Sequence, residues 1–161
     1  MKKIFTSLVT ATAIMGATQA IAATSGSLVI TGTVAEVVSA SITGNQNSFA
    51  ITPGAAITLQ NIGTIDINSN DPDGYTVSLS SSRDGGKLAN GDNNEFVAYT
   101  VKYNGNDNIA LSTSGIVVED VTSQTQDTVS RNLTLDIAAN SSLGRSAEAY
   151  SDIITVTITG K

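Results

Sequence analysis

The chain has 161 residues, with eight basic and fourteen acidic side chains and a formal net charge of −6. It contains no cysteine, histidine or tryptophan, so it forms no disulfide and lacks the most common metal ligand and the most common general base. No cluster of lysine or arginine is present to displace counterions from phosphates, which excludes nucleic acid as a partner.

Residues 1–22 have the form of a secretory signal peptide. Two lysines precede a weakly apolar run at 4–16, and "AIA" at 20–22 places small residues at the two positions that a signal peptidase reads. The apolar run is too short and too rich in threonine to predict a stable membrane span. We expect cleavage after Ala22, which leaves 139 residues with a net charge of −8 and no membrane span. That length suits one secreted domain.

Beyond residue 23 the apolar residues recur at every second position, which predicts strands rather than helices. Loops rich in asparagine, aspartate and glycine separate the apolar runs, and these residues readily take left-handed turn conformations. Many short strands joined by such turns predict an all-β, immunoglobulin-like sandwich. In chain order we expect the main strands at 27–34, 36–43, 62–68, 74–81, 95–103, 130–137 and 149–159, and weaker ones at 49–51, 57–59, 87–89, 108–111 and 115–118.

Two acidic loops are candidates for chemistry. "DPDG" at 71–74 and "NGDNNE" at 90–95 place oxygen ligands close together, as a calcium loop does. The EF-hand pattern is absent, however, and turns favour the same residues. Nothing places Asp71 and Asp73 across a cleft as the two carboxylates of a glycosidase. We therefore predict turns, with no metal, no cofactor and no enzymatic activity, and keep a calcium-dependent adhesive domain as an alternative.

The first predicted strand, within "SGSLVITGTV" at 25–34, has apolar residues on one side and precedes the rest of the domain. Such a segment could detach and lie against another molecule. Eight extended residues, 27–34, would span about 26 Å, which is enough to run along a domain-length groove. The alternate positions on the apolar side are Leu28, Ile30, Gly32 and Val34.

The last predicted strand, within "AYSDIITVTITGK" at 149–161, has an apolar face and a hydroxylated face. An open sheet edge beside an apolar groove is an aggregation hazard. One way to cover such an edge is β-strand addition, in which a peptide from another molecule supplies the missing strand. The even-numbered face is apolar at its last three positions, which are Ile154, Val156 and Ile158.

These two end segments resemble those of chaperone–usher pilus subunits, most nearly the archaic, spore-coat-U-like branch. The ending is similar to that branch's pattern of tyrosine, a spacer, aspartate and then alternating apolar residues. The middle of the chain, 71–91 and 97–105, is also similar to secreted fimbrial sequences. The resemblance implies an incomplete immunoglobulin-like sandwich that lacks its final strand. A periplasmic chaperone would fill the groove first, and the next subunit's N-terminal extension would replace it at the outer-membrane usher.

By this resemblance, residues 23–35 are the donor-strand extension and residues 36–161 are the pilin-like body. Leu28, Ile30, Gly32 and Val34 would be donor positions, with Gly32 facing a shallow pocket. The acceptor groove would be lined by Tyr150, Ile154, Val156 and Ile158. The chain is thus expected to be a structural subunit of a cell-surface fibre (pilus or fimbria) that supports adhesion or biofilm formation. Its partners would be identical or related pilin subunits. The alternative is a self-contained secreted β-sandwich with residues 27–34 in its own sheet, serving as a matrix or ligand-binding module.

Overall fold

The computed structural model describes residues 29–43 and 48–161, with side chains at all of these except 125 and 126. The chain divides into two compact units, Met1–Thr33 and Val34–Lys161. Within the first unit, residues 29–33 form no strand, and the Val29 and Ile30 side chains are more than four-fifths exposed. The strand predicted at 27–34 is therefore not formed over its described residues. A strand requires a neighbouring backbone to bond with, and none of the described strands pairs with residues 29–33.

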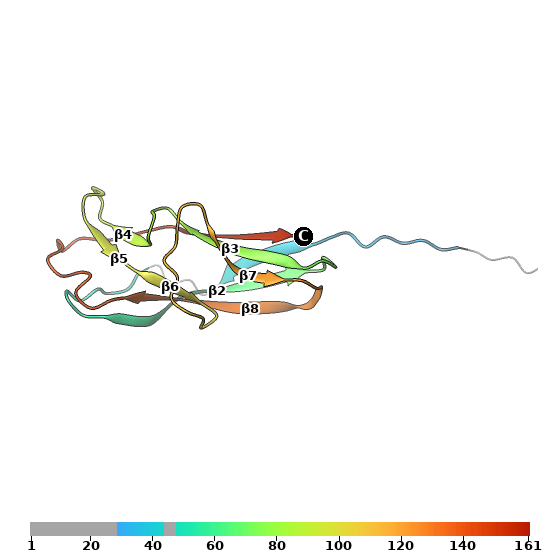
Figure 1. The fold of residues 1–161 in the computed structure, drawn as a ribbon, viewed down its shortest axis with the longest axis horizontal. Coiled ribbons are helices and arrows are strands. Elements are labelled where there is room, and N and C mark those ends of the chain that lie inside the picture. Colours follow the sequence, from blue (N-terminus) through green and yellow to red (C-terminus); the bar gives the residue numbers. More distant parts are fainter. Residues whose placement is uncertain (1–28, 44–47) are drawn as a thin grey trace, which may run out of the picture. The chain divides into compact units, whose positions relative to one another are not determined.

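The second unit, which we call the body, is an all-β sandwich, and no helix occurs among the described residues. The prediction of the fold class is confirmed. Consistent with this, the described part of the chain contains no helix long and apolar enough to cross a membrane. The strands are β1 (Val38–Thr43), β2 (Ile57–Ser69), β3 (Tyr75–Ser81), β4 (Lys87–Ala89), β5 (Phe96–Ala98), β6 (Thr100–Tyr103), β7 (Ile116–Val121), β8 (Thr125–Ile137) and β9 (Ile154–Gly160) (Figure 1).

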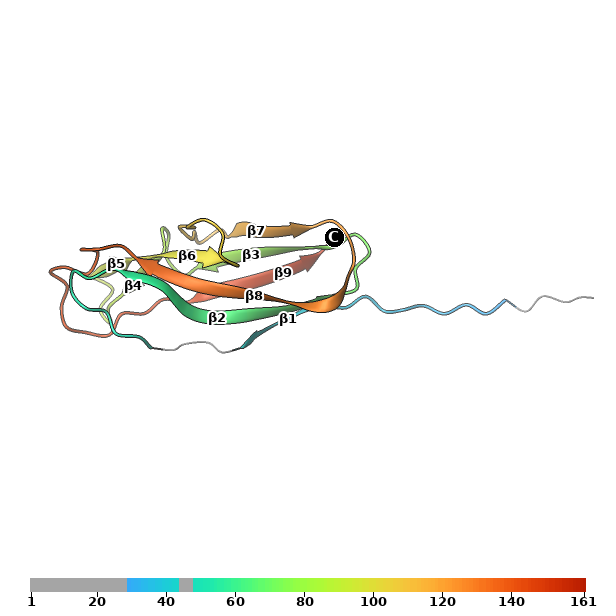
Figure 2. The ribbon, with the colours of Figure 1, turned by 90° about the horizontal axis from the view of Figure 1, so that it is seen from below.

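Two antiparallel sheets form the sandwich. One has the strand order β1-β2-β8-β6 and the other β7-β3-β9, while β4 and β5 form a separate hairpin. In the first sheet Val38 of β1 lies opposite Ser69 of β2, and in the second Gly160 of β9 lies opposite Tyr75 of β3. Edge strands β1 and β9 lie on one side of the sandwich, and edge strands β6 and β7 lie on the other (Figure 2).

The core forms because strands with alternating apolar residues place those residues on one face of each sheet. The central strands β2, β3 and β8 supply most of the core, with β6 adding Val101 and Tyr103. These side chains are at most 5% exposed, so they leave little room for a change of register. The residues from the central strands are Ile65, Ile67, Tyr75, Val77, Leu79, Leu133, Leu135 and Ile137.

Some predicted strands differ from the observed ones. The strand expected at 95–103 is two strands, because Tyr99 between them donates its N–H to the Gly86 carbonyl of the hairpin before the chain joins the first sheet. The strand expected at 49–51 is absent. The one expected at 108–111 consists of a single bridge from Ile109 to Val101. The last strand begins at Ile154 rather than at 149.

A charged cluster closes the side of the sandwich that β6 and β7 form. Arg131 of β8 binds the Glu119 carboxylate of β7 through two nitrogens, with an Nη2–Oε1 distance of 2.5 Å, and the Tyr103 hydroxyl of β6 donates to the same carboxylate. Burial alone would raise the pKa of Glu119, but the hydrogen bonds from Arg131 and Tyr103 outweigh it, so this pKa is lowered. The cluster connects the two sheets on this side.

Candidate strand-binding groove

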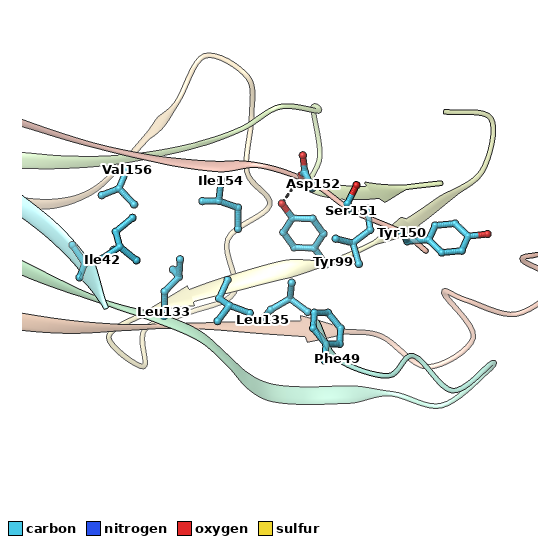
Figure 3. Close-up of a pocket in the computed structure, with 14 residues that line it drawn as sticks. Ile42, Phe49, Tyr99, Leu133, Leu135, Tyr150, Ser151, Asp152, Ile154 and Val156 are labelled. Atoms are coloured by element: carbon cyan, nitrogen blue, oxygen red, sulfur yellow. Dashed lines mark hydrogen bonds between the residues drawn. The ribbon is translucent and has the colours of Figure 1, made fainter. Parts of the chain in front are cut away.

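An apolar groove of about 290 Å³ lies on the opposite side of the sandwich, between edge strands β1 and β9. Figure 3 shows Ile154 and Val156 of β9 pointing toward Leu133 and Leu135 of β8 across this space. Ile42 of β1 lines the other edge. The remaining residues around the groove include Phe49, Ile62, Ile65, Leu88, Tyr99, Tyr150, Ser151 and Asp152.

The apolar side chains at the two edges are only partly covered. On β3, Val77 and Leu79 are 0% exposed, whereas their neighbours across the ladder on β9, Ile158 and Val156, are half-buried. Ile42 on β1 is 52% exposed. Complete burial of one such side chain stabilises a structure by about 1.5–3 kcal/mol. The edges would therefore gain stability from an apolar strand placed between them.

The backbones of the two edges are also available for pairing. Among the described residues, β9 pairs only with β3 and β1 pairs only with β2. Each edge therefore presents a row of N–H and C=O groups on its free side, which is a template for a further strand. A strand lying between β1 and β9 would form backbone hydrogen bonds with both edges and would cover their apolar side chains.

The two ends of the groove differ. At the Gly160 end, a Cβ placed on Gly160 would lie 3.1 Å from Val38 Cγ2 and 2.9 Å from Glu36 Oε1, so this end is filled. At the other end, a second cavity of about 490 Å³ shares Phe49, Tyr150 and Ser151 with the groove. Among the described residues, the groove is therefore filled at one end and adjoins a second cavity at the other.

The Asp152 carboxylate fixes the start of β9 at the edge of the groove. Its side chain is 2% exposed, and it accepts hydrogen bonds from the Tyr99 hydroxyl at 2.6 Å and the Ser81 hydroxyl at 2.5 Å. Burial works to raise the pKa of Asp152, but the hydrogen bonds outweigh burial and lower it. The further donors are the Ser82 hydroxyl, the Arg83 guanidinium and the Ile153 N–H.

Tyr150 is held at the open end of the groove by a second carboxylate. Its hydroxyl donates to Glu95 Oε2 at 2.6 Å, and this bond, followed by burial, raises the pKa of Tyr150 to about 12. Glu95 also accepts the Ser146 N–H at 2.8 Å, so its pKa is lowered by the hydrogen bonds from Tyr150 and Ser146. The ring is thus fixed in place where the groove meets the second cavity.

The sequence-predicted acceptor residues lie on the groove side of the body. Tyr150, Ile154 and Val156 line the groove, and Ile158 packs against the core from the same face of β9. The sequence did not identify the opposite edge or the floor, which are Ile42, Phe49, Leu133 and Leu135. The strand predicted at 130–137 contains Leu133 and Leu135, but no local signal pairs that strand with β9.

The predicted donor residues are described only in part. Leu28 lies outside the described residues. Ile30 and Val34 are each 86% exposed, and a Cβ on Gly32 would meet no atom within 4 Å. Their apolar side chains are therefore free to bind a surface.

The acidic loops use their oxygens within turns. Asp71 accepts the N–H groups of Asp73 at 2.9 Å and Lys161 at 2.8 Å, and the Asn90 side-chain oxygen accepts the N–H groups of Asn94 and Glu95. Across residues 29–43 and 48–161, no three carboxylates gather as a metal site requires. These contacts favour the prediction that the loops are structural turns.

Removing calcium is accordingly expected to leave the melting temperature of the protein nearly unchanged. A ligand that binds only the native state would stabilise it, so its removal would lower the melting temperature. The measurement is thermal unfolding with excess EDTA, with added calcium and with added magnesium. A loss of several degrees in EDTA that calcium alone restores would support the calcium-dependent alternative.

The protein is thus an all-β sandwich with an apolar groove between the edge strands β1 and β9. No model of a known protein family matches this chain, and no curated protein sequence matches it. Function must therefore be inferred from the groove and from the residues that can fill it.

Proposed function

We propose that this chain is a structural subunit of an extracellular fibre that polymerises by donor-strand exchange. In this proposal the apolar segment at 25–34 of one subunit fills the groove between β1 and β9 of the next. The observation that supports it most is the groove itself, which combines two free backbone edges with a half-covered apolar lining. An alternating strand is the ligand that such a surface fits.

The difference between the two groove ends supports one direction of binding. Because Glu36 and Val38 fill the end beside Gly160, the incoming strand enters from the Phe49 end with its own N-terminus first. It then runs parallel to β1 and antiparallel to β9. In this direction Leu28 lies deepest in the groove, and Val34 lies near the open end.

Burial of the donor residues supplies the free energy of assembly. Each fully buried leucine, isoleucine or valine contributes about 1.5–3 kcal/mol. This gain is offset by the cost of ordering the segment and of association. The resemblance to chaperone–usher pilins adds the expectation that a periplasmic chaperone covers the groove before assembly at an outer-membrane usher. The fibre would then lie on the cell surface and support adhesion or biofilm formation.

Ile30→Asp is expected to abolish assembly, because donor binding would bury an unpaired charge in the groove. Gly32→Leu is expected to weaken assembly by about 1–3 kcal/mol through overpacking at a position that faces a shallow pocket. Neither change should alter the stability of the body, because both residues are exposed and lie outside it. The measurements are thermal melting of the isolated monomer and the ladder of polymers on an unheated gel.

Thr31→Asp is the matched control, since it adds the same charge one residue away, on the other face of the donor strand. It should assemble far better than Ile30→Asp. If Gly32→Leu lowers the melting temperature of the monomer as much as it reduces assembly, residues 27–34 belong to the chain's own sheet. The self-contained sandwich would then be the correct description.

A further inference from the structure

Asn70, the residue after β2, holds the three residues that precede β1. Its side-chain oxygen accepts the Val37 N–H at 2.6 Å, and its side-chain nitrogen donates to the Ala35 carbonyl at 2.8 Å. Its backbone N–H donates to the Val37 carbonyl at 3.0 Å. Residues 35–37 therefore continue the line of β1 beyond the end of the β1–β2 ladder, in which Val38 lies opposite Ser69. We call these three bonds the Asn70 clamp.

The clamped residues also fill the closed end of the groove. Glu36 Oε1, Val38 Cγ2 and Asp71 Oδ2 all come so close to Gly160 that a Cβ there would lie 2.6–3.1 Å from them. Real Cβ atoms essentially never have contacts below 3.0 Å. A Cβ at this position would require these side-chain ends to shift, and glycine leaves room for them. Glu36 and Val38 occupy the space that an additional strand between β1 and β9 would need here.

This geometry opposes binding of the extension in its own groove. To reach that groove, residues 28–34 would have to turn back directly before β1 and enter at the filled end. Even the tightest hairpin needs two turn residues outside the ladder. Residues 36 and 37 would have to serve as that turn, which would break the Asn70 clamp and displace Glu36 from Gly160.

An obstacle of this kind is necessary if the chain is to polymerise. A segment tethered to its own groove by a short linker has an effective concentration in the millimolar range. A donor from another molecule at micromolar concentration would lose the competition if both fitted equally well. Self-binding would then yield closed monomers and no fibre.

We infer that Asn70 is a positioning residue that prevents self-complementation, so the occupant of the groove is residues 28–34 of a second copy of this chain. This inference rests on the proposed function. Asn70 acts through the direction of residues 35–37 and does not itself contact the donor strand. Its removal should therefore change which donor fills the groove rather than whether a donor fits.

The test compares the full chain with Asn70→Ala, Asn70→Asp and Asn68→Ala. Asn70→Ala removes both side-chain bonds of the clamp, whereas Asn70→Asp keeps an acceptor for the Val37 N–H. Asn68 is exposed near the end of β2, two residues before Asn70, and serves as the matched control. The ratio of closed monomer to polymer is measured at one fixed concentration by size-exclusion chromatography and on unheated gels. The melting temperature of the monomer is measured over a range of concentrations.

We expect Asn70→Ala to raise the ratio of closed monomer to polymer about tenfold, with a melting temperature that does not depend on concentration. Asn70→Asp should give a smaller increase in the same ratio. If Asn70→Ala fails to fold, the ratio measured for Asn70→Asp tests the inference. Asn68→Ala should match the wild type.

A separate binding measurement distinguishes failure of this inference from failure of the proposed function. A labelled peptide of residues 25–36 is titrated into a body that lacks residues 23–35. If the peptide binds and both Asn70 variants have the wild-type ratio, the clamp does not direct the extension and this inference is wrong. If the peptide does not bind, the groove is not a donor site, and both proposals fail.

Discussion

Deleting residues 23–35 is expected to abolish fibre formation by the chain alone while leaving a folded body that still accepts a donor strand. The deletion removes every proposed donor residue but leaves the strands β1–β9 of the described residues and the groove. The truncated protein should therefore run as a monomer on an unheated gel. A synthetic peptide of residues 25–36 should raise its melting temperature. At a hundredfold excess over its Kd, the peptide would stabilise the body by about 2.7 kcal/mol.

A second variant, which can donate a strand but cannot accept one, tests the two roles separately. Val156→Asp places a charge in the groove lining, so the full chain with this change can donate a strand but cannot accept one. Each of the two proteins alone should stay monomeric, and a mixture should form dimers and nothing longer. Thr157→Asp is the control, because Thr157 is exposed on the other face of β9 and this variant should still polymerise. Normal long fibres from the truncated protein alone would show that residues 23–35 are not the donor.

Asp152→Ala is expected to cause the largest loss of stability in the body, about 3–5 kcal/mol. The substitution removes the bond from the Ser81 hydroxyl, which still donates to the Arg83 carbonyl. It leaves the Tyr99 hydroxyl without its acceptor, and an unsatisfied buried polar group costs about 1–3 kcal/mol. It also removes the partner of Arg83. Denaturant unfolding of the isolated body measures the loss, and Asp127→Ala, at an exposed carboxylate, serves as the control.

The contribution of Asp152 should depend on pH in a defined direction. Its pKa is lower in the folded protein than in the unfolded chain, where an aspartate titrates near 3.9. The folded state therefore binds this proton less tightly, and the stabilisation is fully present above about pH 4. It is lost as the pH falls through the folded pKa. Asp152→Asn should remove this part of the acid dependence, and an unchanged pH profile in that variant would contradict the assignment.

Periodicity predicted the strands well where a strand lies beside its partners within the body. The alternation of 149–159 placed Ile154 and Val156 on one apolar face, because a period of two assigns every residue of a strand to one of two faces. The family resemblance assigned that face to a groove, and both residues line it. The same reasoning predicted a strand at 27–34, which is not formed over its described residues, 29–34. Alternation indicates a preference for a partner strand and does not supply one.

The other parts of the groove depend on contacts that are remote in the sequence. Ile42 and Phe49 lie about a hundred residues before β9, and only the order of strands in the two sheets places them near Ile154. Asp152 was part of a family-like pattern, yet its role depends on Ser81 and Tyr99, which are 71 and 53 residues away. Local patterns cannot indicate such pairings.

The opposite ends of the groove have a mechanical consequence for a fibre assembled in this way. Tension on a subunit acts through residues 35–37 at one end of β1 and through the bound donor strand, which leaves the body near Phe49 at the other end. The two pulling points therefore lie at opposite ends of neighbouring parallel strands. A load in this direction shears all the hydrogen bonds between those strands at once instead of opening them one after another. A fibre held only by noncovalent contacts would thereby resist pulling, with no disulfide to share the load.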